Sequence, residues 1–234
     1  MRYFLVIPAA GSGRRFSAHV PKQYAALGGS TVIEHALAPF ESDPDCAGIA
    51  VAIAADDTLW PAVAARRTRL VETAEGGEQR AHSVRNVLRA LDARVRDDDW
   101  IMVHDAARPC FSAGDLALLK KELAPHEVGG LLAVPLADTL KRAADANAAE
   151  VAATVDRSGL WRAATPQVFR FGVLLRALDA ALAANRIPTD EAQALEWAGF
   201  RPRLIAGRAD NIKVTTTDDL KLATAILALR LEHH

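Results

Sequence analysis

Short apolar segments alternate with longer amphipathic segments along the 234 residues of this chain. Runs such as Phe4-Leu5-Val6-Ile7 and Ile101-Met102-Val103 are apolar at consecutive positions, which is typical of strands buried on both faces. The Ala- and Leu-rich segments between such runs carry apolar residues at helical spacing. We expect strands over residues 3–8, 48–54, 70–73, 100–104, 130–135 and 203–206, and helices over residues 32–40, 79–91 and 112–123.

Buried strands that alternate with helices predict an α/β fold with a Rossmann-like, mostly parallel sheet and helices on both faces. Ligands of such sheets bind beyond the carboxyl ends of the strands. We expect further helices after Phe169, after Pro188 with Thr189 as N-cap, and after Thr216. Residues 1–230 should form a single domain, and residues 231–234 resemble the start of a purification tag, so their two histidines are left out of any metal site.

The alternation of strands and helices breaks after Pro135. Two extended segments, residues 139–142 and 151–155, flank a polar stretch, and this pattern predicts a protruding β-hairpin arm over about residues 137–157. A hairpin of two strands is only marginally stable by itself in water. We therefore expect the arm to pack on a second copy of the chain and to form a homodimer.

Composition narrows the function classes. Half of the residues are hydrophobic, and 28 basic residues nearly balance 29 acidic ones, which argues against a nucleic-acid-binding surface. No apolar run approaches the roughly 20 residues that a membrane-spanning helix needs. The chain has two cysteines, Cys46 and Cys110, without paired spacing. We expect a cytoplasmic protein, with no membrane partner and no zinc site.

The strongest chemical signal follows the first expected strand, in Pro8-Ala9-Ala10-Gly11-Ser12-Gly13-Arg14-Arg15. Small residues there let backbone N–H groups approach a phosphate closely. A dinucleotide-binding loop would have a third glycine where Phe16 stands, and a Walker loop would continue with Gly-Lys-Ser/Thr. Arg15 and Lys22 would suit a phosphoryl group in transfer. The alternative is a tight turn with solvated arginines.

Three further segments carry candidate chemistry. Asp105 follows an expected strand, where it could hold Mg²⁺ on a triphosphate, with Arg108 on a phosphate; the alternative is an ion pair that closes the strand end. Lys213 follows Asp210 before the last helix, and the pair would suit a phosphate and a metal or would form an ordinary turn. The glycines before residues 78–83 could receive a base or a ribose, or form a loop and an N-cap.

Eight short motifs occur in a characteristic order: Pro8-Ala9-Ala10-Gly11-Ser12-Gly13-Arg14-Arg15, Pro21-Lys22-Gln23-Tyr24, Gly76-Gly77-Glu78-Gln79-Arg80, His104-Asp105-Ala106-Ala107-Arg108-Pro109, Thr154-Val155-Asp156-Arg157, Thr165-Pro166-Gln167, Thr189-Asp190-Glu191-Ala192 and Asp210-Asn211-Ile212-Lys213-Val214. Together they resemble the 2-C-methyl-D-erythritol 4-phosphate cytidylyltransferases from Val6 to the final helix. The resemblance implies attack of methylerythritol phosphate on the α-phosphorus of CTP, with Mg²⁺ as cofactor and pyrophosphate as the leaving group.

The resemblance also implies roles for single residues. It places Arg15, Lys22 and Lys213 in catalysis; Ala9, Ala10, Gly11, Gly13, Gly77, Glu78, Ser83 and Ala107 at the nucleotide; Asp105, Arg108, Thr139, Arg157 and Thr165 at the substrate; and Asp105 at the metal. In the family, the arm of one subunit reaches into the site of the other. Glu78 and His82 stand where the family more often has aspartates, and His82 is expected to face solvent.

Three other functions remain to be weighed against this one. A related cytidylyltransferase for ribitol 5-phosphate would share the loop chemistry and differ at the arm and near Thr165. A dinucleotide-dependent oxidoreductase is disfavoured by Phe16 and by the Arg14-Arg15 pair. A nucleotide sensor without turnover would keep the fold, but Arg15, Lys22 and Asp105 are all present. The loop over residues 11–22 is expected to be mobile without nucleotide.

Overall fold

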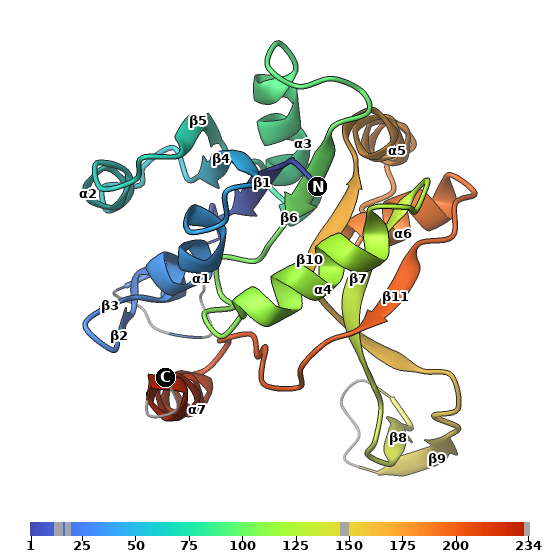
Figure 1. The fold of residues 1–234 in the computed structure, drawn as a ribbon. Coiled ribbons are helices and arrows are strands. Elements are labelled where there is room, and N and C mark those ends of the chain that lie inside the picture. The colour runs from blue at the N-terminus through green and yellow to red at the C-terminus, as the bar shows by residue number, and fades with distance from the viewer. Residues whose placement is uncertain (12–15, 17–19, 146–149, 232–234) are drawn as a thin grey trace.

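The computed structural model describes residues 1–11, 16, 20–145 and 150–231 (Figure 1). Most of its strands belong to one sheet, and two short hairpins stand beside it. The strands are β1 (Tyr3–Pro8), β2 (Ala26–Leu27), β3 (Ser30–Thr31), β4 (Cys46–Ile53), β5 (Leu70–Glu75), β6 (Trp100–Val103), β7 (Gly129–Pro135), β8 (Leu140–Ala143), β9 (Val151–Val155), β10 (Trp161–Arg170) and β11 (Arg203–Ala206).

The main sheet has seven strands in the order β11-β7-β10-β6-β1-β4-β5. All neighbours are parallel except β10, which runs antiparallel between β6 and β7. The expected α/β fold with a mostly parallel sheet is therefore confirmed, and all six expected strands are present with small changes of bounds. The long strand β10 was not expected. Its register shifts between Ala163 and Gln167, on either side of Pro166, which has no N–H to donate to a neighbouring strand.

Helices cover both faces of this sheet, as Figure 1 shows. Alternate side chains of β1 point to opposite faces: Leu5 and Ile7 pack in a core with α1, α2 and α4, whereas Phe4 and Val6 pack in a core with α3, α5 and α6. The helices are α1 (Val32–Glu41), α2 (Trp60–Ala64), α3 (Arg80–Leu91), α4 (Ala113–Leu123), α5 (Phe171–Ala183), α6 (Glu191–Trp197) and α7 (Thr217–Leu231), with a 3-10 turn η1 (Lys22–Tyr24).

Side-chain caps explain where several helices begin. The Ser112 hydroxyl accepts from the backbone N–H of Asp115 at the start of α4. The expected N-cap at Thr189 is wrong by one residue, because Asp190 caps α6 and accepts from the N–H of Gln193. Asp190 lies three residues before Gln193, which is the spacing at which an N-cap side chain reaches a free helical N–H, and aspartate is a more favourable N-cap than threonine. Leu231, assigned above to a tag, is the last residue of α7.

The expected arm is present as the antiparallel hairpin of β8 and β9, which projects away from the main sheet at the lower right of Figure 1. Its strands pair Leu140 with Val155 and Lys141 with Thr154. The side chains of β9 are almost all exposed, and Val151 is 62% exposed. Among the described residues, no helix is long and apolar enough to cross a bilayer.

Candidate active site

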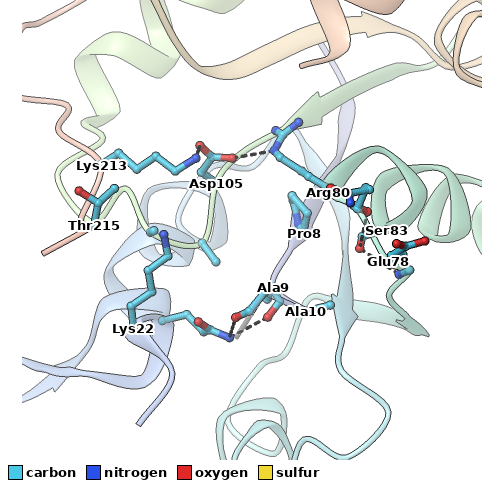
Figure 2. A pocket seen from close by; sticks show the side chains of 16 residues that line it. Pro8, Ala9, Ala10, Lys22, Glu78, Arg80, Ser83, Asp105, Lys213 and Thr215 are labelled. Atoms are coloured by element: carbon cyan, nitrogen blue, oxygen red, sulfur yellow. Dashed lines mark hydrogen bonds and ion pairs between the residues drawn. The ribbon is translucent and has the colours of Figure 1, made fainter. Parts of the chain in front are cut away.

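A pocket of about 770 Å³ lies beyond the carboxyl ends of β1, β5 and β6 (Figure 2). This volume lies within the range typical of small-molecule sites. Two loops of small residues, two lysines, an arginine and two carboxylates line it. The lining residues are Pro8, Ala9, Ala10, Gly11, Lys22, Gln23, Gly77, Glu78, Gln79, Arg80, Ser83, Asp105, Ala106, Ala107, Lys213 and Thr215.

The loop after β1 is held by the buried side-chain amide of Gln23. The Nε2 atom of Gln23 donates to the carbonyl of Ala9 at 2.7 Å and to that of Gly11 at 3.3 Å, and Gln23 is only 4% exposed. The N–H of Ala9 donates to Ala52 of the neighbouring strand at 2.8 Å. The backbone of this loop is thereby fixed at the pocket. Gly13 and Arg15, expected at the nucleotide and in catalysis, lie outside the described residues, as does most of the loop expected to be mobile.

The second loop, between β5 and α3, touches the first. The N–H of Gly76 donates to Ile53 at 2.7 Å, and a Cβ atom on Gly76 would lie 2.2 Å from the Cβ of Ala10. The Ser83 hydroxyl accepts from the N–H of Gly77 at 3.1 Å, so it shapes the loop. Two loops of small residues in close contact therefore line this side of the pocket.

Residues 78 and 82, where this sequence differs from the family pattern, lie in different surroundings. Glu78 is exposed at the pocket rim. His82 was expected to face solvent, but it is half-buried, and its Cβ packs near Gly77 because the loop turns back over the first turn of α3. Within the described residues, the buried Nδ1 atom of His82 has no hydrogen-bond partner.

Asp105 is the centre of charge in the pocket. Its carboxylate lies 3.0 Å from Nε of Arg80, 2.9 Å from Nζ of Lys213 and 3.5 Å from Nε of Arg108. Burial alone would raise the pKa of Asp105, but the three nearby cations outweigh it and hold this pKa far below its usual value. Asp105 therefore stays ionised at any pH at which the protein would work.

The two lysines reach the pocket from different elements. Lys22 comes from η1 and Lys213 from the segment before α7, and Lys213 is 39% exposed. Figure 2 shows both lysines toward one end of the pocket and Glu78 with Ser83 toward the other. The pocket thus has an end with two lysines beside Asp105 and an opposite end lined by the β5–α3 loop, where no lysine is present among the lining residues and Glu78 lies at the rim. That division suits a ligand with phosphates at one end and a polar ring at the other.

The backbone before the pocket is fixed by a buried chain of hydrogen bonds. The N–H of Asp105 donates to the Thr165 hydroxyl, and this hydroxyl lies 3.0 Å from Nδ1 of His104. Nε2 of His104 lies 3.2 Å from the carbonyl of Arg108, so we place the ring proton on Nε2 and let Thr165 donate to Nδ1. Burial lowers the pKa of His104 to about 4, which keeps the ring neutral.

Four expected site residues lie outside the pocket in this chain. Arg108 sits behind Asp105 and donates to the carbonyl of Asn211 at 2.7 Å. Thr165 is 4% exposed, and its hydroxyl is engaged as described above. Thr139 and Arg157 are exposed at the base of the arm, where Arg157 donates to the carbonyl of Ala137. The structure therefore brings ten of the expected residues together around the pocket. Arg108 and Thr165 contact Asp105 without lining the pocket, whereas Thr139 and Arg157 lie in the arm.

Residues without an expected role also build the site. Arg80 lines the pocket and joins Asp105 to the buried Glu191, and Gln23 supports the first loop. Both stand inside quoted motifs, but a motif does not reveal which partner a side chain has across the fold. Asp210, which had been a metal candidate, binds Arg208 and Arg230 instead, and so secures α7.

A divalent metal would find few protein ligands here. No cluster of three or more His, Cys, Asp or Glu side chains suited to a metal occurs in the part of the chain that the structure describes. Mg²⁺ is commonly bound through one or two carboxylates together with phosphate oxygens and water. Asp105, an ionised carboxylate on the pocket wall, fits that donor set when a triphosphate supplies the other oxygens.

Comparisons with known proteins agree on one family. The sequence model of the 2-C-methyl-D-erythritol 4-phosphate cytidylyltransferases matches residues 3–229. The enzymes of that name from Pseudomonas putida strain W619 and Pseudomonas aeruginosa are 53% and 52% identical to the chain, which they match over 94% and 93% of its length and 93% of their own.

Solved structures agree with the sequences. A crystal structure of a 4-diphosphocytidyl-2C-methyl-D-erythritol synthase superposes with a TM-score of 0.84 at 39% identity, over 97% of this chain and 99% of the other. The Francisella tularensis 2-C-methyl-D-erythritol 4-phosphate cytidylyltransferase superposes with a TM-score of 0.82 at 36% identity, over 97% and 100% of the two chains.

Proposed function

The chain belongs to the 2-C-methyl-D-erythritol 4-phosphate cytidylyltransferase family, and we propose that the pocket around Asp105 is where it joins its two substrates. The enzyme transfers a cytidylyl group from CTP to 2-C-methyl-D-erythritol 4-phosphate. The products are 4-diphosphocytidyl-2-C-methyl-D-erythritol and pyrophosphate, in the non-mevalonate pathway to isoprenoid precursors. The observation that supports this assignment of the pocket best is the arrangement of two touching small-residue loops opposite Lys22 and Lys213.

The reaction is a single displacement at phosphorus. A phosphate oxygen of methylerythritol phosphate attacks the α-phosphorus of CTP, and the bond from that phosphorus to the bridging oxygen breaks. Pyrophosphate leaves with the electron pair. The protein needs to hold the two phosphates in line and to neutralise the charge that gathers on the equatorial and leaving oxygens. No covalent intermediate with the protein is required.

Lys22 and Lys213 would supply much of that neutralisation. Both line the pocket at the end nearest Asp105, and an ammonium group is a compact donor to phosphate oxygens. The ion pair with Asp105 at 2.9 Å holds Lys213 in place before the substrate arrives. Arg15 is proposed as a third cation at the α-phosphate on the strength of the motif in which it stands.

The opposite end of the pocket would receive the cytidine. Gly77 and Glu78 line it from the β5–α3 loop and Ser83 from the start of α3, and Ala9, Ala10, Gly11 and Ala107 also line the pocket. Cytosine can donate through its amino group and accept through its carbonyl and ring nitrogen. Backbone groups of the two loops can match such a pattern without side-chain ordering at binding.

Mg²⁺ is proposed as the cofactor, held by Asp105 and the triphosphate. When bound, it would neutralise phosphate charge and orient the leaving pyrophosphate. The three cations around Asp105 keep its carboxylate ionised and so able to bind the metal. Lys213 would then exchange part of its contact with Asp105 for a phosphate oxygen.

A homodimer would complete the site. Thr139 and Arg157 belong to the base of the arm, and neither lines the pocket of its own chain. The exposed hairpin of β8 and β9 needs a covering surface. We propose that the arm of one subunit brings Thr139 and Arg157 to the substrate phosphate in the other.

Subunit complementation tests this arrangement. Lys213→Ala removes a cation from the pocket, and Arg157→Ala removes the proposed phosphate contact from the arm. Each variant alone should be nearly inactive. In a mixture, half of the dimers are mixed, and one of their two sites combines an intact pocket with an intact arm, which gives about a quarter of the wild-type activity. A mixture as inactive as its components would show that each arm serves its own pocket or none.

Pyrophosphate release tests the proposed function as a whole. Purified protein is given CTP and Mg²⁺ with either methylerythritol phosphate or ribitol 5-phosphate, and Arg15→Ala serves as control. Release that requires methylerythritol phosphate and falls in the control supports the assignment of substrate and of Arg15. Release only with ribitol 5-phosphate would contradict it, and CTP binding without any release would indicate a nucleotide sensor.

A further inference from the structure

Glu191 is a buried carboxylate that the reaction scheme above does not use. It is the first residue of α6, it is 1% exposed, and it does not line the pocket. Its Oε1 atom accepts from Nη1 of Arg80 at 2.6 Å, and its Oε2 atom accepts from Nη2 at 3.0 Å. A guanidinium gripped at both terminal nitrogens cannot rotate about its long side chain.

Arg80 passes this restraint to the pocket. Its Nε–H, the donor on the side of the fork, points to Oδ1 of Asp105 at 3.0 Å. The second oxygen of Asp105, Oδ2, is thereby left to Lys213 at 2.9 Å and to Arg108 at 3.5 Å. In Figure 2 the dashed contact from Arg80 and the contact from Lys213 reach the two sides of the same carboxylate.

The start of α6 is itself tied to the sheet. Gln167 of β10, 1% exposed, accepts from the N–H of Ala192 at 2.8 Å and donates to Asp190 at 2.9 Å. Gln167 is paired with Val103 at the end of β6, two residues before Asp105. Glu191 and Asp105 are therefore fixed to the same point of the sheet, although 86 positions separate them in the sequence.

We propose that Glu191 is a positioning residue for cytidylyl transfer. It holds Arg80 so that a single N–H reaches Oδ1 of Asp105, and Oδ2 is left to Lys213, which lines the pocket. It also balances the charge of Arg80, which would otherwise compete with Lys213 and an incoming cation for Asp105. This inference rests on the proposed role of Asp105 in the reaction.

Burial supports a role beyond stability. A buried ion pair adds little stability compared with apolar side chains of the same volume, because both charges lose their hydration. Here the ion pair of Glu191 and Arg80 contacts a third charged group, Asp105, which lines the pocket. Gln167 and Glu191 thus help to position Arg80 and Asp105 at the pocket, although neither of them lines it.

The test compares Glu191→Gln with Glu196→Gln. Glutamine has nearly the same shape but no charge, so Arg80 should turn toward Asp105. We expect kcat for cytidylyl transfer to fall about 10- to 100-fold, since small misplacements in an active site have effects of this size. Affinity for CTP, measured by calorimetry, should change less than about threefold, because both nucleotide loops are intact.

Glu196→Gln is a matched control on the same helix. Glu196 is exposed, and no ion pair in the described part of the chain includes it. Its kcat should stay within about twofold of wild type, as is usual for surface substitutions. An unchanged kcat in folded Glu191→Gln would overturn the proposal, and so would a kcat that falls only as far as the folded fraction does.

Two further measurements keep the test decisive. Arg80→Lys keeps the charge but loses the two-nitrogen contact with Glu191, and it should also lower kcat at nearly constant affinity for CTP. Loss of the fold in both Glu191→Gln and Arg80→Lys would make Glu191 a structural residue and refute the proposal. The Nε–H signal of Arg80 in ¹⁵N NMR should exchange slowly in wild type and fast in Glu191→Gln. This signal reports the bridge without any turnover, so an inactive wild type would count against the proposed function alone.

Discussion

Replacement of Gly76 by alanine should disable nucleotide binding through a steric clash. The added Cβ atom would lie 2.2 Å from the Cβ of Ala10 and 3.1 Å from the hydroxyl of Ser83. Non-bonded carbons prefer about 3.5–4.0 Å, so the loops must separate by roughly 1.5 Å. Gly76 cannot move away easily, because its N–H is bonded to Ile53 at 2.7 Å. The loop that carries Ala9 and Ala10 is held as well, by Ala52 and Gln23, so the strain displaces both nucleotide loops.

The magnitude follows from two effects. Overpacking of this kind costs about 1–3 kcal/mol of folding free energy, which lowers the melting temperature by about 2–12 °C in a chain of this length. Displacement of a substrate-positioning group by about 1 Å can reduce the rate about 100-fold. We expect kcat/KM for CTP to fall by one to two orders of magnitude, roughly, and more than the loss of stability alone explains.

The assay is pyrophosphate release together with a thermal melt, and Gly114→Ala is the control. A Cβ atom on Gly114, in the first turn of α4, would meet nothing closer than the Ser112 hydroxyl at 3.7 Å. This variant should keep full activity and gain up to about 1 kcal/mol, as alanine does in helices. Wild-type kcat/KM in Gly76→Ala would refute the contact between the loops.

Three further predictions concern buried groups. Gln23→Ala removes the donor to the carbonyls of Ala9 and Gly11, and affinity for CTP in calorimetry should fall about tenfold; unchanged affinity would mean that the loop holds its shape unaided. Ser83→Ala frees the N–H of Gly77, and should raise KM for CTP about fivefold with little effect on the melting temperature. The pKa of His104 is about 4 in the fold, below the value of about 6.5 for an unfolded histidine. Its contribution to stability is therefore complete above pH 6.5 and lost as the pH falls toward 4, about 3 kcal/mol in all. Urea unfolding at pH 7 and pH 4.5 should show a smaller loss for His104→Gln than for wild type, and equal losses would contradict this assignment.

Much of the fold could be predicted because consecutive apolar residues mark parallel strands. Segments 3–8 and 100–104 have that pattern, and they are the central strands β1 and β6. Strand β10 could not be predicted in this way. It contains Thr165, Pro166 and Gln167, whose polar groups are satisfied only by partners elsewhere in the fold, namely His104, Asp105 and α6.

In the site, too, local features could be predicted from the sequence and contacts across the fold could not. The loops of small residues and the two lysines are local features, and the motif order identified them. Arg80 and Glu191 stand 111 positions apart, and nothing local indicates that their side chains meet. Thr165 illustrates a further limit: its position in a motif predicts substrate contact, and the structure adds a contact that the motif does not reveal, from the N–H of Asp105 to its hydroxyl. A sequence position indicates importance, and the contacts are needed to tell what it does.

Phosphorus NMR of the reaction mixture tests the central claim most directly. Protein, CTP, Mg²⁺ and methylerythritol phosphate are combined, and the products are identified by their ³¹P signals. Attack at the α-phosphorus predicts pyrophosphate and a diphosphate diester with two mutually coupled signals, in equal amounts, both absent when Arg15→Ala replaces the wild type. Formation of CDP and inorganic phosphate, or CTP left unchanged by folded wild-type protein that binds it, would contradict cytidylyl transfer in this pocket.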